Sequence, residues 1–172
     1  MLLCALTLLA FFLPPAKPAA SEDAVFAPLW AYTGTWQVSK KSQAAGGKPY
    51  QLANSCAQVG QFFSCQQVTD GSVSALLVIV PTRTPGHFYT QSILPDARAT
   101  RRGDLYIEGD KWTFASNWNQ GGKTIYYRTV NTFAGKTRIH FEQQESTDNK
   151  EWKVVDSGDQ LRTVPGKATV AR

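Results

Sequence analysis

The stretch that decides the fold is YTGTWQVS, residues 32–39, in which Gly34 and Trp36 flank a threonine. A glycine here lets the chain turn sharply from a leading helix into a first strand, because it accepts backbone angles closed to other residues. The flat indole of Trp36 is large enough to lie across one end of a barrel and close it. Arg162, in the late segment DQLRTV, is suited to stack over that indole if the last strand returns beside the first. The alternative is an ordinary core tryptophan after a turn glycine.

The rest of the chain consists of short strand-like segments separated by turn residues. The expected strands span residues 34–41, 49–59, 62–69, 72–81, 87–94, 103–108, 111–118, 123–133, 136–145 and 150–156, with a last short piece near 159–163 after a bulge at Gly158. Several alternate between an apolar and a polar face, as where Trp112, Phe114 and Trp118 share one side of their strand. Turn signals every 8–12 residues or so are typical of an antiparallel sandwich or barrel.

The N-terminus differs in composition from everything that follows. Residues 2–13, LLCALTLLAFFL, are apolar but too short for a membrane span, which needs about 20 residues. We interpret residues 1–20 as a secretory signal peptide, residues 21–163 as one barrel domain and residues 164–172 as a flexible C-terminal tail. No membrane span is expected after cleavage. Ser21 is a candidate N-cap for a short helix whose length Pro28 limits.

Two cysteines, Cys56 and Cys65, remain once the signal peptide is removed. If Gly60-Gln61 is a two-residue type II′ turn, counting outward pairs residue 56 with residue 65 at a non-hydrogen-bonded position. Their Cα atoms are then about 4.5 Å apart, at the short end of the disulfide range. The spacing predicts a disulfide, with two buried free thiols as the alternative, and favours a periplasmic or secreted location.

The short helix, the Gly-x-Trp of the first strand, the up-and-down run and the late arginine together resemble the lipocalin or calycin pattern. The segments RGDLYIEGDKWTF, KTIYYRTVNTF and HFEQQESTDNKEWKVVDSGDQLR are similar to the later strands of bacterial lipocalin-like proteins, whose role is mostly unassigned. In those, a polar E-S-x-D-x-x-x-W hairpin precedes the final strand, matched here by Glu145, Ser146, Asp148 and Trp152. The resemblance covers residues 29–162. It implies an all-β, single antiparallel up-and-down barrel of eight to ten strands, often with an apolar cavity, and no particular reaction.

Aromatic residues carry the strongest functional signal. Tyrosine and tryptophan combine apolar surface with a polar tip that can orient a ligand. We therefore expect non-covalent binding of a small apolar or amphipathic molecule without a cofactor; the alternative is a barrel filled by its own side chains. The candidate lining residues are Phe88, Trp112, Phe114, Trp118, Tyr127 and Phe141.

Other classes of function find less support in the sequence. It contains no phosphate-binding loop and no zinc-protease motif, so we do not expect an enzyme, although an isomerase or cyclase stays open. His87 and His140 are the only histidines, and neither is expected to bind haem or a metal. The basic stretch from Arg98 to Arg102 contains no aromatic residue, so no nucleic-acid partner is expected. The second hypothesis is a protein-binding module, such as an inhibitor of a secreted protease, acting through residues 21–33 or its loops.

Overall fold

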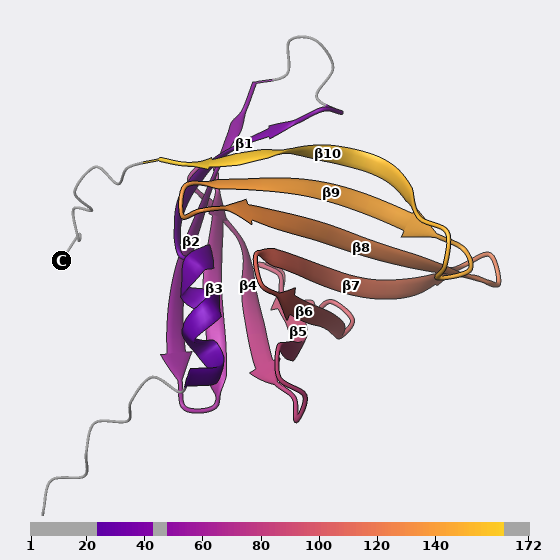
Figure 1. Cartoon of the computed structure of the whole chain (residues 1–172), viewed down its shortest axis with the longest axis horizontal. Helices are drawn as coiled ribbons and strands as arrows, with labels where there is room; N and C mark the ends of the chain where they lie inside the picture. The colour runs from indigo at the N-terminus through magenta and orange to yellow at the C-terminus, as the bar shows by residue number, and fades with distance from the viewer. Residues whose placement is uncertain (1–23, 43–47, 164–172) are drawn as a thin grey trace, which may run out of the picture.

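The computed structural model describes residues 24–42 and 48–163, and in this part of the chain ten antiparallel strands form one closed barrel (Figure 1). Each strand pairs with its neighbours in sequence, and the last returns to pair with the first. The predicted all-β, up-and-down barrel is confirmed. The strands are β1 (Gly34–Lys40), β2 (Tyr50–Val59), β3 (Phe62–Thr69), β4 (Ser72–Pro81), β5 (His87–Ile93), β6 (Gly103–Glu108), β7 (Lys111–Gln120), β8 (Lys123–Ala134), β9 (Arg138–Ser146) and β10 (Lys153–Arg162).

One short helix, η1 (Ala24–Tyr32), precedes β1 and packs against the end of the barrel where β1 begins. Phe26 and Leu29 are fully buried, and the ring of Phe26 lies 6.0 Å from that of Phe63 on β3. The predicted helix is therefore present, but Pro28 lies inside it instead of limiting it. The helix is of the tighter 3-10 type, and the buried residues on either side of the proline hold it in place. Ser21, the predicted signal peptide (residues 1–20) and the predicted C-terminal tail (residues 164–172) lie outside the described residues.

The hairpin of β2 and β3 has the predicted register. Val59 pairs with Phe62 and Cys56 with Cys65, and the two cysteines form a disulfide with Cα atoms 4.0 Å apart. Gly60 has a φ of +59°, the left-handed conformation that the first position of this turn requires. Counting outward from one glycine was therefore enough to find the covalent link.

The last strand differs from the prediction. It runs without interruption through Lys153–Arg162, and its irregularity falls between Val154 and Asp156, not at Gly158. Gly158 instead pairs in regular register with Phe141 on β9. A Cβ atom at Gly158 would collide with the carbonyl oxygen of Ser39 and lie 2.8 Å from Cζ of Phe141. Gly158 therefore allows β1 and the ring of Phe141 to come close to β10. This close approach, and not a bulge, explains the glycine in the strand.

Strand length gives the barrel an uneven rim. β5 has seven residues and β6 has six, whereas β7 and β8 have ten and twelve. In Figure 1 the long strands β7–β10 run across the view and project beyond β5 and β6. We call the end where β1 begins the closed end, and the opposite end, next to the short strands, the mouth. The fully buried side chains that form the core include Trp36, Phe63, Phe88, Ile79, Leu105 and Ile139.

Candidate ligand-binding site

The closed end is built around the indole of Trp36, which is fully buried. Its Nε1 donates a hydrogen bond to the carbonyl oxygen of Tyr32 at 3.2 Å. Cζ of Arg162 lies 4.3 Å from the centre of the Trp36 ring, and the two residues are direct partners across β1 and β10. A guanidinium at this distance over an indole face makes a favourable cation–π contact.

Arg162 also ties two separate backbone segments together, the connection from η1 to β1 and the turn between β8 and β9. Its guanidinium donates to the carbonyl oxygens of Ala31, Thr33 and Lys136, the first and last at 2.7 Å. Burial lowers the pKa of Arg162, but an arginine stays charged at any physiological pH. Gly34 has a φ of +126°, and a Cβ atom there would lie 2.6 Å from a terminal nitrogen of Arg162. The glycine is therefore needed for two reasons: it adopts the backbone conformation of the turn into β1, and it leaves room for the guanidinium of Arg162.

A cavity of about 290 Å³ occupies the lumen of the barrel. Strand alternation brings side chains from most of the strands to it, and uncharged polar groups make up much of its wall. Phe114 and Phe141 contribute aromatic surface, and Leu52 and Leu77 aliphatic surface. The polar residues that line it are Tyr32, Tyr50, Gln67, Ser92, Thr129, Asn131, Gln143 and Gln160, and among the residues that the structure describes the only charged one is Lys40.

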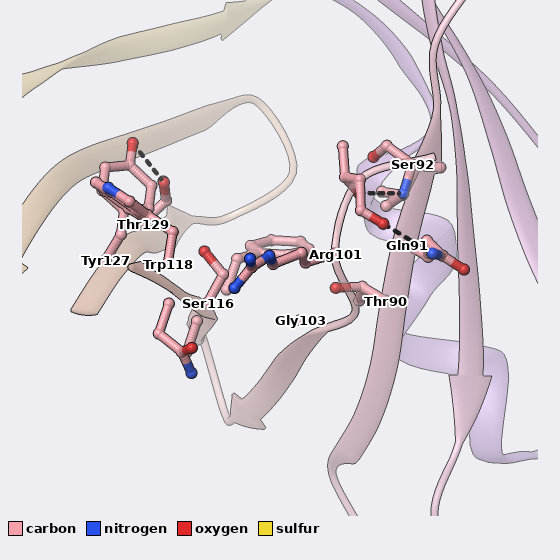
Figure 2. A pocket seen from close by; sticks show the side chains of 14 residues that line it. Thr90, Gln91, Ser92, Arg101, Gly103, Ser116, Trp118, Tyr127 and Thr129 are labelled. Carbon is pink, nitrogen blue, oxygen red and sulfur yellow. Dashed lines mark hydrogen bonds between the residues drawn. The ribbon is translucent and has the colours of Figure 1, made fainter. Parts of the chain in front are cut away.

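A second cavity, of about 520 Å³, lies at the mouth between β5 and the β7–β8 hairpin (Figure 2). Leu77, Ser92, Phe114 and Thr129 line both cavities, so the lumen cavity and the mouth cavity adjoin. In Figure 2 the side chain of Arg101 extends into the space between the two walls. Ligand pockets typically occupy about 300–1,000 Å³, so the space is sufficient for a small organic molecule.

The six aromatic residues predicted to line a cavity divide into two groups. Trp118 and Tyr127 lie at the mouth, Phe141 lies in the lumen, and Phe114 lines both cavities. Phe88 and Trp112 are 1% and 3% exposed and belong to the packed core, and neither is among the residues lining the two cavities. A side chain that faces inward can thus be part of the core or part of the cavity wall, and strand parity does not distinguish the two.

A polar network links the helix to the lumen. The Asn54 amide donates to the carbonyl oxygen of Tyr32 at 3.3 Å and accepts a hydrogen bond from Gln67 at 3.1 Å. The ring of Tyr32 lies 6.2 Å from the rings of both Trp112 and Phe114. Burial raises the pKa of Tyr32, so its phenol stays protonated at neutral pH. This part of the lumen is therefore polar but carries no charge.

Charged groups lie toward the mouth. Lys40, at the last position of β1, has its Nζ 4.0 Å from Asp156 and 5.9 Å from the centre of the Tyr50 ring. Of the described part of the chain, Arg101 is the only charged residue that lines the mouth cavity, and it is exposed. Charged groups therefore lie at the mouth end, and uncharged groups line the deeper part of the lumen.

The two histidines are bonded to carboxylates. His87 lies 2.8 Å from Asp104 and stacks on the ring of Tyr106 with 4.6 Å between ring centres, and His140 lies 3.2 Å from Asp159. Neither lines the lumen or the mouth cavity. Residues 24–42 and 48–163 contain no group of three or more His, Cys, Asp or Glu side chains arranged to hold a metal ion.

Parts of the candidate site were missed by reasoning from sequence. Asn131 and Gln160 are 2% and 7% exposed and line the lumen. The signal for Asn131 was present, since it shares strand parity with the buried Phe133. An amide on an inward face is not by itself a signal of a site, because its role depends on the partners that the other strands bring to it.

The arrangement is that of a hollow antiparallel barrel with one closed end and an amphipathic interior. No protein-family model matches the chain, and no curated protein matches it. The crystal structure of Rv2717c from M. tuberculosis is similar at 14% identity, with a TM-score of 0.48, over 82% of this chain and 98% of that one. Within the described part of the chain, no helix is long and apolar enough to cross a membrane.

Proposed function

We propose that this protein binds a small amphipathic molecule non-covalently inside the barrel, as a lipocalin-like carrier. The observation that carries the proposal is the pair of adjoining cavities, which share the lining residues Phe114 and Thr129. A core packed solid would leave no such volume in a domain of this size. Transfer of apolar ligand surface from water into the lumen would supply the affinity, at about 25 cal/mol per Å².

The place of action that fits this role is the periplasm or the outside of the cell. The Cys56–Cys65 disulfide supports it, because such bonds persist in oxidising compartments. The apolar residues 2–13, interpreted as part of a signal peptide, support it independently. A protein in such a location is exposed to free amphiphiles and membrane lipids, which are the ligands a hollow barrel suits.

The alternative role as a protease inhibitor has less support. That role would favour a filled barrel with residues 21–33 standing away from it. Residues 24–32 instead form η1, whose Phe26 and Leu29 are fully buried. We therefore keep ligand binding as the single proposed function.

The first test is native mass spectrometry of the protein purified from its own host, with a retained molecule of defined mass as the expected result. The second is titration with Nile red, an uncharged dye that fluoresces in apolar surroundings. Thr129→Phe places a ring where the two cavities adjoin, so it should abolish dye binding. Thr132→Phe adds the same ring to an exposed position of the same strand and should leave binding unchanged. Equal dye binding by both variants would contradict the proposal, provided that each keeps the unfolding midpoint of the unaltered protein.

A further inference from the structure

Two buried amide side chains in the lumen have unpaired oxygen atoms. Oδ1 of Asn131 and Oε1 of Gln160 are inaccessible to water, and no described residue donates a hydrogen bond to either. The amide of Asn54, also buried in this barrel, shows the contrast, because it both donates and accepts. Buried polar atoms in native proteins nearly always have a partner, so each exception needs an explanation.

Both amides lie deep in the barrel, away from the mouth. Asn131 and Gln160 line the lumen cavity and do not line the mouth cavity. Replacing either amide by an apolar side chain of similar shape would cost the empty protein little, since it would remove an unsatisfied acceptor. Their ladder partners on the adjacent strands are all 3% exposed or less: Val38, Trp112, Ile139 and Phe141.

The charge distribution defines what these amides can receive. Apart from Lys40, which is close to Asp156 at the mouth end of β1, the residues within 24–42 and 48–163 that line the lumen are uncharged. A carboxylate brought to this depth would lose its hydration without meeting a cation. A hydroxyl or amide group carries the hydrogen-bond donor that Asn131 and Gln160 lack, at a much smaller desolvation cost.

Resting on the proposed function, we infer that the natural ligand is an uncharged amphiphile that enters with its polar end first. A primary amide has two N–H groups and can donate to both Asn131 and Gln160 after a small rotation of their side chains, whereas a hydroxyl has one O–H and donates to one of the two. The apolar part of the ligand then lies against Leu77 and Phe114 and ends near Trp118 at the mouth. The opposite orientation would place an anionic head beside Arg101 and the apolar tail in the lumen, and the two orientations predict different ligand preferences.

The experiment measures displacement of Nile red by four decyl compounds that share one chain: decanol, decanamide, decyl methyl ether and decanoate. Decanol and decanamide should bind about 3- to 10-fold more tightly than the ether, which lacks a donor, and more tightly than decanoate. Asn131→Leu and Gln160→Met should each reduce the affinity for decanamide, whose two N–H groups serve both oxygens, about 3- to 10-fold and leave that for the ether unchanged. Thr132→Val, on an exposed position of β8, serves as the control and should change neither.

A purely structural role for the amides is tested by the stability of the empty variants. If the amides serve a ligand, the thermal midpoints of Asn131→Leu and Gln160→Met should equal or exceed that of the unaltered protein. Lower midpoints combined with unchanged affinities would overturn the inference. Tighter binding of decanoate, weakened by Arg101→Gln, would overturn it in favour of tail-first entry. Equal affinities for decanol and the ether would overturn the inference about ligand orientation but not the proposed function. Absence of Nile red binding to the unaltered protein would overturn both the inference and the proposed function.

Discussion

Replacement of Arg162 by methionine tests the structure of the closed end. Methionine keeps much of the apolar stem but removes the guanidinium, which donates to Ala31, Thr33 and Lys136 and lies 4.3 Å from the centre of the Trp36 ring. Two of the three carbonyl groups are exposed, so water can replace their partner and each bond contributes at the low end of about 0.5–1.5 kcal/mol. The cation–π contact adds about 0.5–1 kcal/mol. We expect a loss of about 3 kcal/mol in the free energy of unfolding.

The measurement is urea unfolding followed by tryptophan fluorescence, with near-ultraviolet circular dichroism to report on the setting of Trp36. Arg162→Lys keeps the charge but not the planar fork, so it should lose about 2 kcal/mol. Arg101→Met removes an arginine from the exposed mouth and should change the free energy by no more than about 0.5 kcal/mol. If Arg162→Met costs less than about 1 kcal/mol, or no more than Arg101→Met, the guanidinium does not hold this end together.

Three further predictions concern other parts of the barrel. Gly158→Ala should lower the free energy of unfolding by more than about 2 kcal/mol, since its Cβ would collide with Ser39 and Phe141. Gly71→Ala is the control: Gly71 has open space around it, so the substitution should cost only about 1 kcal/mol for the positive φ. Equal losses in urea unfolding would show that crowding at Gly158 has no effect. Replacing Cys56 and Cys65 together by alanine should cost about 2–3 kcal/mol, as expected for a short closed loop, and a cost near zero in the same assay would contradict this. The pKa of Asp148 should lie below its usual range, because its carboxylate accepts hydrogen bonds from the backbone of Lys150 and Glu151 and from Ser146. Its contribution to stability is then complete above the pKa of the unfolded chain and is lost as the pH falls through the lower folded value; carbon-13 titration of the carboxyl group checks this, and an ordinary pKa would contradict it.

The sequence predicted those features that depend on local rules. Gly60 and Gln61 set the register of one hairpin, and from that register the pairing of Cys56 with Cys65 followed by counting. Alternation in residues 111–118 identified an inward face, because successive side chains of a strand point to opposite sides. These inferences need no knowledge of what lies across the barrel.

The features that were missed depend on distant neighbours. Whether Trp112 fills the core or lines a cavity is decided by rings from other elements, such as Phe133, whose centre lies 4.6 Å away. The unpaired state of Asn131 is likewise a property of several strands at once. Gly158 was interpreted as a bulge because its sequence neighbours give no sign of the Phe141 ring that covers it.

The pairing of β1 with β10 has a consequence for how the molecule is made. The amide of Thr163 donates to the carbonyl oxygen of Thr35 at 2.9 Å, so the seam joins the first and last strands of the described chain. During synthesis, β1 can pair with β10 only after nearly the whole polypeptide has been made, and pairings between such distant parts of the sequence form slowly. Until β10 is present, the unpaired edges of β1 and β9 expose backbone amide and carbonyl groups that can pair with any extended segment nearby. A nascent or truncated chain that ends before residue 153 lacks β10, so β1 and β9 each keep an unpaired edge and the chain is prone to aggregate.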